Sequence, residues 1–245
     1  MNRYAIQLSY NGGRYFGWQR QPKDISVQEV LEKAFSTILR EEIAIIGAGR
    51  TDTGVHASFY IAHFDTENEI TDTVQFAYKL NRFLPADIAI QKIRKVDNEF
   101  HARFSAVSRT YKYFISTVKN PFSTDTRFQY TVPLNVDLMN EAAKTLFEFT
   151  DFTSFSKLHT DVKTNNCKIY QAEWERQGDQ LVFTIKADRF LRNMVRAIVG
   201  TLLEVGKGKI STEEFAEIIE RKDRGEAGTS VPPQGLFLVD IEYNA

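Results

Sequence analysis

An aspartate between glycines, Asp52 in the stretch GAGRTDTGVHA, is the residue of this chain whose surroundings most favour chemistry. Gly47, Gly49 and Gly54 fall within eight residues, and Arg50 stands two positions before the aspartate. Glycines permit tight turns and allow a ligand to approach the backbone closely, at an entropic cost. The segment is therefore either an ordinary turn or a catalytic or binding site.

Four interpretations of this segment differ in what they require of the aspartate. Asp and Gly favour turns without any function, so the first is a plain turn. A phosphate-binding loop is disfavoured, because the glycines do not form G-x-G-x-x-G and no helical pattern follows them. Asp52-Thr53-Gly54 also matches the Asp-Thr-Gly of aspartic proteases, in which two carboxylates share one proton.

The protease interpretation requires a partner that this chain does not contain. There is no second Asp-Thr-Gly or Asp-Ser-Gly, so only a homodimer could supply the pair. A nearby arginine, Arg50, also favours the ionised carboxylate, which is the wrong form for that chemistry. The fourth interpretation is an ionised, nucleophilic Asp52, since a carboxylate attacks only when it is deprotonated.

The composition excludes several other classes of protein. The 245 residues are 42% hydrophobic and 26% charged, which is ordinary for a soluble globular chain. No apolar run approaches the roughly 20 residues of a membrane span, and MNRYAIQLSY alternates like a strand rather than a signal peptide. The single cysteine, Cys167, cannot form an internal disulfide, and the four histidines lack zinc spacing. We expect a cytoplasmic protein without a membrane anchor or a metal.

The charge is near balance, with 31 Lys and Arg against 32 Asp and Glu, so composition alone does not indicate a nucleic-acid-binding protein. A local basic surface is still possible, because the field depends on where the charges lie. In RFLRNMVRAIVGTLL, Arg189, Arg192 and Arg196 fall at i, i+3 and i+7. That spacing predicts one helical face, with its arginines directed into a cleft.

Periodicity predicts two copies of the element order βαββαβ, the second with one extra helix. The elements expected in the first copy cover 4–10, 26–39, 43–46, 58–65, 72–84 and 88–96. Those in the second cover 108–116, 135–149, 168–175, 181–187, 190–205, a short helix from 211, and 235–243.

This order predicts an α+β fold of two pseudo-symmetric ferredoxin-like halves, 1–105 and 106–245. The halves are expected to form one extended, mostly antiparallel sheet with helices on one face. A ligand is then expected in the cleft between them.

Several segments together resemble the TruA family of tRNA pseudouridine synthases. GRTDTGVHA resembles the family's catalytic loop, which usually has Ala at the position of Thr53, and YFGWQRQP with SVQEVLEKAF resembles its N-terminal segment. FHARFSA with RTYKYF, then FLRNMVRAIVGTLLEVG and PPQGLFL, resemble its central and C-terminal motifs. The motifs keep their order, so the resemblance covers essentially the whole chain.

The resemblance implies isomerisation of uridine to pseudouridine in the anticodon stem-loop of tRNA, at positions 38 to 40, without metal or cofactor. It makes Asp52 the nucleophile, which attacks either the uracil ring or the ribose C1′. A base inside a stem must be flipped out before its glycosidic carbon can be reached. Since the family forms homodimers, tRNA and a second copy of the chain are the implied partners.

Other roles carry over by position. Arg50 would pair with the aspartate and help to fill the space left by the flipped base. Tyr111 would stack on uracil and aid proton removal, and Arg196 would lie near the catalytic carboxylate. Leu236, or else Leu238, would supply an apolar floor to the base pocket.

Four further residues are predicted to contact RNA: His101, Arg103, Arg189 and Arg192. A competing class is an RNA-binding or RNA-folding protein that uses the same surface without catalysis. The intact GRTD segment and Tyr111 argue against that class, because binding alone does not need a buried nucleophile.

Overall fold

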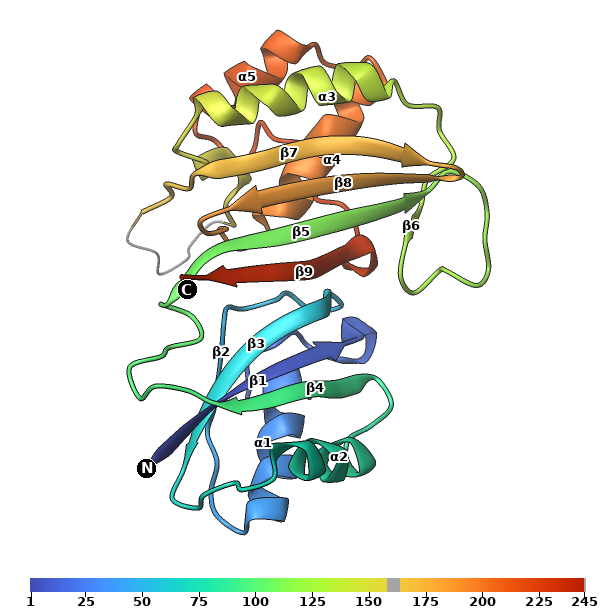
Figure 1. Cartoon of the computed structure of the whole chain (residues 1–245). Helices are drawn as coiled ribbons and strands as arrows, with labels where there is room; N and C mark the ends of the chain where they lie inside the picture. Colours follow the sequence, from blue (N-terminus) through green and yellow to red (C-terminus); the bar gives the residue numbers. More distant parts are fainter. Residues whose placement is uncertain (158–163, 245) are drawn as a thin grey trace. The chain divides into compact units, whose positions relative to one another are not determined.

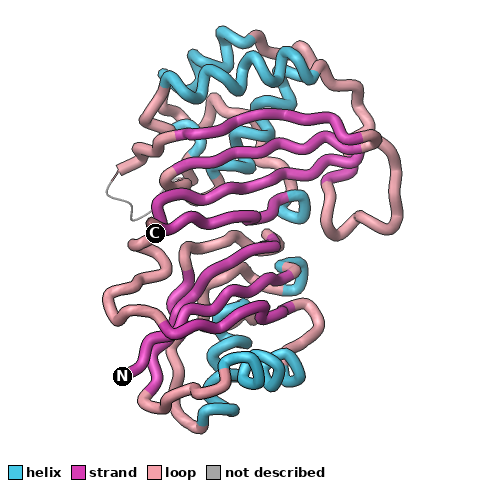
Figure 2. The backbone as a smooth tube through the Cα atoms, viewed as in Figure 1, coloured by secondary structure: helices cyan, strands magenta, loops and turns pink. Residues whose placement is uncertain are grey.

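A computed structural model describes residues 1–157 and 164–244. Contacts divide the chain into two compact units, one made of Met1–Val107 with Phe237–Ala245 and the other of Ser108–Leu236. Each unit combines a sheet with helices, as the ribbon and the tube both show (Figures 1 and 2). The predicted α+β class is confirmed. Within the described ranges, no helix has the length and apolar character needed to cross a bilayer.

The first unit contains the predicted strands and helices in the predicted order (Figure 1). They are β1 (Asn2–Tyr10), α1 (Val27–Leu39), β2 (Ile45–Gly47), β3 (His56–Thr66), α2 (Thr73–Phe83) and β4 (Ile88–Lys95). β1 lies between β3 and β4 and is antiparallel to both, and β2 is antiparallel to β3. With β3 between β1 and β2, this is the split βαβ arrangement of a ferredoxin-like unit.

Local signals in the sequence explain where the two helices of this unit begin and end. The Ser26 hydroxyl accepts from the N–H of Glu29 at the start of α1. The Asp72 carboxylate caps α2 in the same way, and that helix ends just before Pro85. The buried face of α1 carries Phe35, whose ring packs edge-on against that of Phe64 on β3. Together these signals fix the helices that cover the sheet.

One edge of β3 has two different partners. β2 pairs with its second half, from Ala62 to Phe64, while β9 (Leu236–Tyr243) pairs in parallel with its first two residues. In that register His56 lies opposite Phe237. β1 pairs along β3 from 57 to 66, so β2 and β9 share the opposite edge. The last strand of the chain thus lies beside the start of β3, directly after the loop that carries Asp52.

The second unit follows the predicted order from 106 to 220, with additions, whereas most of the last predicted strand belongs to the first unit. Its elements are β5 (Ala106–Ser116), β6 (Phe128–Gln129), α3 (Val136–Thr145), β7 (Ile169–Gln177), β8 (Gln180–Ala187), α4 (Met194–Gly206) and α5 (Thr212–Glu220). β8 lies between β5 and β7 and is antiparallel to both, and β6, which was not predicted, pairs in parallel with β5. The helices α3, α4 and α5 contact one another.

The helix predicted over 190–205 begins later than expected. α4 starts at Met194, after Asn193, whose backbone is left-handed with φ of 66°. The Asp188 carboxylate accepts from the N–H groups of Arg189 and Lys168, which ties the preceding segment to the start of β7. A left-handed residue does not continue a right-handed helix. The prediction of three arginines on one helical face was therefore wrong, since Arg189 and Arg192 both lie before the helix and only Arg196 is in it.

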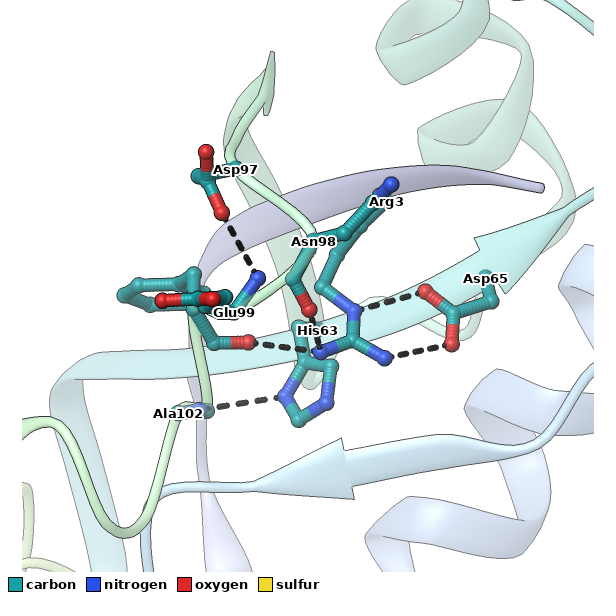
Figure 3. Close-up of polar contacts among 8 residues, drawn as sticks. Arg3, His63, Asp65, Asp97, Asn98, Glu99 and Ala102 are labelled. Carbon is teal, nitrogen blue, oxygen red and sulfur yellow. Dashed lines mark hydrogen bonds and ion pairs between the residues drawn. The ribbon is translucent and has the colours of Figure 1, made fainter.

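In the first unit, an arginine joins two strands to the loop of residues 97–105 (Figure 3). The guanidinium of Arg3 on β1 donates to both carboxylate oxygens of Asp65 on β3, at 2.7 Å each. Its remaining nitrogen, Nη1, donates to the carbonyl oxygens of Asn98 and Phe100. A two-point ion pair combined with carbonyl contacts fixes the loop on the sheet.

The same loop is held by a buried histidine of β3. The N–H of Ala102 donates to Nδ1 of His63 at 3.1 Å, so this nitrogen carries no proton (Figure 3). Burial, followed by the charges of Arg3 and His101, lowers the pKa of His63 to about 4. An unfolded histidine has a pKa of about 6.5. The unfolded chain therefore takes up a proton at higher pH than the folded one.

We expect the free energy of unfolding to fall as pH drops from about 6.5 to about 4, by up to about 3 kcal/mol from His63. Above about 6.5 this group contributes no pH dependence, because it is neutral in both states. Denaturant titrations at pH 7, 5.5 and 4.5 measure the effect. His63→Gln keeps a neutral acceptor for Ala102 and should show a shallower slope. Equal slopes in the two proteins would contradict the assignment to His63.

Candidate active site

The loop that joins β2 to β3 carries Asp52 on a tight turn. The carbonyl oxygen of Asp52 accepts from the N–H of Val55 at 3.1 Å, and Gly54 has φ of 78°. A positive φ at the third position of a turn favours glycine. The plain-turn interpretation is therefore right about the backbone, and the Asp52 side chain is half-buried at the first position of that turn.

Two buried tyrosines hold the backbone just before this turn. The hydroxyl of Tyr60 on β3 donates to the carbonyl of Gly49 and lies 3.4 Å from its N–H. A buried hydrogen bond of 2.9 Å joins the hydroxyls of Tyr10 and Thr51. Thr51, next to Asp52, is therefore fixed by the buried side chain of Tyr10. A simple surface turn would not require such support.

A tryptophan adds a second layer of support. The ring of Trp18 stacks on that of Tyr60, with centroids 4.1 Å apart and planes at 26°. Its backbone N–H donates to the carbonyl of Thr51 at 3.3 Å. The carbonyls of Gly17 and Trp18 accept in turn from the N–H groups of Val27 and Gln28 at the start of α1. The segment before α1 thus bonds to the helix on one side and to the Asp52 loop on the other.

Removing the Tyr60 hydroxyl tests this support. We expect Tyr60→Phe to lower kcat about tenfold and to destabilise the fold by about 1–2 kcal/mol, because Gly49 loses its buried partner. The ring and its stacking on Trp18 remain. Single-turnover kinetics and thermal unfolding measure the two effects. Wild-type values of both would show that the hydroxyl does not position the loop.

Arg50 lies on the same loop as Asp52, two positions before it. Its side chain is exposed. An exposed guanidinium beside the loop is accessible to an anionic ligand. Its contribution to the site stays a prediction.

In the second unit, the two tyrosines that alternate on β5 differ in burial. Tyr113 is fully buried, and its hydroxyl donates to the carbonyl of Pro232 at 2.7 Å. Burial raises the pKa of Tyr113 well above its usual range. Tyr111 is only half-buried, and its ring meets that of Phe190 edge-on at 5.1 Å. Tyr113 is thus a core residue, whereas Tyr111 keeps an accessible surface.

The predicted arginines of the second unit have different surroundings. Nε of Arg196, in the first turn of α4, donates to the carbonyl of Val231 at 2.7 Å, which fixes the direction of its side chain. Arg189 is half-buried and donates to the carbonyl of Thr164, and Arg192 is exposed. The side chain of Arg196 is therefore oriented by a backbone carbonyl.

The remaining predicted residues lie on the last strand and on the 97–105 loop. Leu236 and Leu238 are both buried, and Leu238 lies opposite Ala57 in the pairing of β9 with β3. His101 and Arg103 belong to the 97–105 loop of the first unit. The predicted site residues are thus divided between the two units, with Asp52 and Arg50 in the first and Tyr111 and Arg196 in the second.

Comparisons with known proteins identify the family. A family model described as tRNA pseudouridine synthase matches residues 6–105 and 142–244. The chain belongs to this family. A Bacteroides fragilis protein named tRNA pseudouridine synthase A is 59% identical over 244 residues, covering 99% of this chain and 97% of that protein. A Bacillus subtilis protein of the same name is 42% identical over 246 residues and covers 99% of each chain.

The enzyme is therefore a member of an isomerase family, as the motifs predicted. The residues that hold the Asp52 loop were not identified as such from the sequence. Tyr10, Trp18 and Tyr60 read as ordinary strand and loop aromatics, although the family motif YFGWQRQP contains one of them. That motif, placed before a helix, was the one signal in the sequence for the contacts that Trp18 makes with Tyr60 and Thr51.

Proposed function

We propose that this enzyme isomerises uridine to pseudouridine in the anticodon stem-loop of tRNA, at positions 38 to 40, with Asp52 as the nucleophile. The observation that carries the proposal is a half-buried carboxylate next to a residue fixed by Tyr10 and Trp18. Such fixed placement before the substrate arrives is what nucleophilic catalysis needs. The relatives named tRNA pseudouridine synthase A support the same reaction.

The reaction rearranges bonds without any net change in atoms. The C1′–N1 bond of uridine breaks, the uracil turns, and a C1′–C5 bond forms. The proton on C5 leaves, and N1 ends with a proton in its place. Asp52 attacks either the ribose C1′ or the uracil ring, and in both routes its ester is released before the product departs.

The flipped base needs a pocket as well as a nucleophile. In this proposal Tyr111 stacks on the uracil and aids removal of the C5 proton, and Arg196 lies near the carboxylate. Leu236 supplies the apolar floor, and Arg50 contacts the RNA. Stacking on an aromatic ring returns about 1–3 kcal/mol of the cost of unstacking the base.

Tritium release tests the reaction and its position together. Uridine labelled at C5 in an unmodified tRNA transcript loses its label when pseudouridine forms. We expect release from the wild-type transcript and none when uridines 38, 39 and 40 are replaced by cytidine. Tight binding without release from any tRNA would instead favour an RNA-binding protein without catalysis.

The proposal includes a cytoplasmic homodimer. The net charge of −1 gives one chain little excess positive charge with which to hold a tRNA, so two copies are expected to share it. We expect light scattering at working concentration to give twice the mass of the chain. A monomeric mass would contradict this part of the proposal.

A further inference from the structure

Three aromatic rings, in edge-on and tilted contacts, form a column that runs from the core of the first unit to its surface. His63, on β3, is 1% exposed, and its ring meets that of His101 at a centroid distance of 4.9 Å. The ring of His101 meets that of Phe104 at 4.3 Å. Phe104 is 75% exposed, so most of the outermost ring remains accessible.

The loop that carries the outer two rings is held by hydrogen bonds at many points. The N–H and the carbonyl of His101 bond to the hydroxyl and the N–H of Ser105, at 3.0 and 2.9 Å. Nδ1 of His101 accepts from the N–H groups of Arg103 and Phe104. The Tyr243 hydroxyl donates to the carbonyl of Ala102 at 2.7 Å, and Figure 3 shows the Arg3 and His63 contacts on the same loop. Phe104 is thus presented on a fixed backbone.

The groups around the exposed ring are those that bind nucleotides. The guanidinium carbon of Arg103 lies 5.4 Å from the centroid of the Phe104 ring, in a cation–π arrangement. Aromatic rings and guanidinium planes stack on unpaired bases, and the charge attracts phosphate. Asp97 and Glu99 are at the start of the loop, where the Asp97 carboxylate accepts from the N–H of Glu99. The cationic and aromatic groups therefore gather at the loop's other end.

This group of residues lies well away from Asp52. Asp52 precedes the first residue of β3, His56, whereas the ring column begins at His63, seven residues further along the strand. The rise of an extended strand separates His56 from His63 by roughly 20 Å. A contact at Phe104 would therefore be made with a nucleotide other than the one that reacts.

We propose that Phe104, supported by His101 and Arg103, is a stacking site for an unpaired base of the tRNA other than the reacting uridine. The proposal rests on the proposed function for the identity of the RNA. Its occupant is RNA rather than protein because the ring is flanked by a guanidinium and an imidazole and continues an existing column of rings.

Binding of an unmodified full-length tRNA transcript tests the site. We expect Phe104→Ala to raise Kd roughly five- to a hundredfold, the loss of one stacked base, with kcat at saturating tRNA unchanged. Phe104→Trp keeps a ring and should bind within about twofold of wild type. Tyr78→Ala on α2, which removes another exposed ring (59% exposed), is the matched control and should not change Kd.

The possible outcomes separate this site from the reaction. If wild type releases tritium and Phe104→Ala binds tRNA as wild type does, the stacking site is disproved and the proposed function stands. If wild type releases none but Phe104→Ala still weakens binding, the reaction fails and the RNA contact stands. A lower mass of Phe104→Ala in light scattering, with unchanged Kd, would assign the ring to a protein interface and overturn the proposal.

Discussion

Asp52→Asn is expected to release tritium at least about a thousandfold more slowly than wild type, while its Kd for tRNA stays within a few-fold of wild type. The substitution keeps the size of the side chain and removes its charge and nucleophilicity. Because the turn is held by backbone contacts from Val55 and Tyr15, the loop should keep its shape. Single-turnover release and filter binding on the same tRNA transcript measure the two quantities.

Two further variants make this result interpretable. Asp52→Ala cannot regain a carboxylate by deamidation, so it should be as inactive as the asparagine variant. Thr53→Ala changes the exposed neighbour of the nucleophile and should keep activity within a few-fold. Turnover above about a tenth of the wild-type rate in both Asp52 variants would remove Asp52 from the reaction.

Gly17→Ala is expected to lower kcat about a hundredfold without replacing any residue assigned to the site. Gly17 has φ of 84°, and a Cβ there would lie 2.3 Å from the carbonyl oxygen of Thr51 and 3.2 Å from the carbonyl carbon of Asp52. The loop must therefore shift, and a displacement of about 1 Å at a nucleophile costs roughly a hundredfold in rate. The strained backbone should also cost about 1–3 kcal/mol of stability.

Gly49→Ala is the matched control in the catalytic loop itself. A Cβ on Gly49 would have no atom within 4 Å, so this variant should keep near-wild-type kcat and stability. Kd for tRNA should stay within a few-fold in both glycine variants. Equal kcat for the two would show that the contact between Gly17 and Thr51 does not position Asp52.

Much of the first unit was predictable because its signals are local. The capping residues Ser26 and Asp72, the proline after α2 and the alternation of β1 gave the elements within a few residues of their observed ends. The family was predictable from motifs spread along the whole chain. The turn at Asp52 was also visible, since it depends on one aspartate and one glycine two positions later.

The rest depends on contacts between distant residues. The late start of α4 follows the left-handed backbone of Asn193, which a helical hydrophobic pattern does not reveal. The support from Tyr60 and Trp18 appears only when β3 and the segment before α1 come together. The exposed position of Arg50 likewise follows from side-chain placement, which residue order does not determine.

The pairing of β9 with β3 has a consequence for how the enzyme is made. Residues 108–236 are synthesised between the two parts of the first unit, which at roughly 5–20 residues per second takes about 6–26 s. During that interval the edge of β3 nearest the Asp52 loop, and the Ala102 carbonyl bonded by Tyr243, await a strand still to be translated. A nascent chain that has not yet reached β9 would therefore lack the strand beside its nucleophile, so activity should begin only after β9 has been translated.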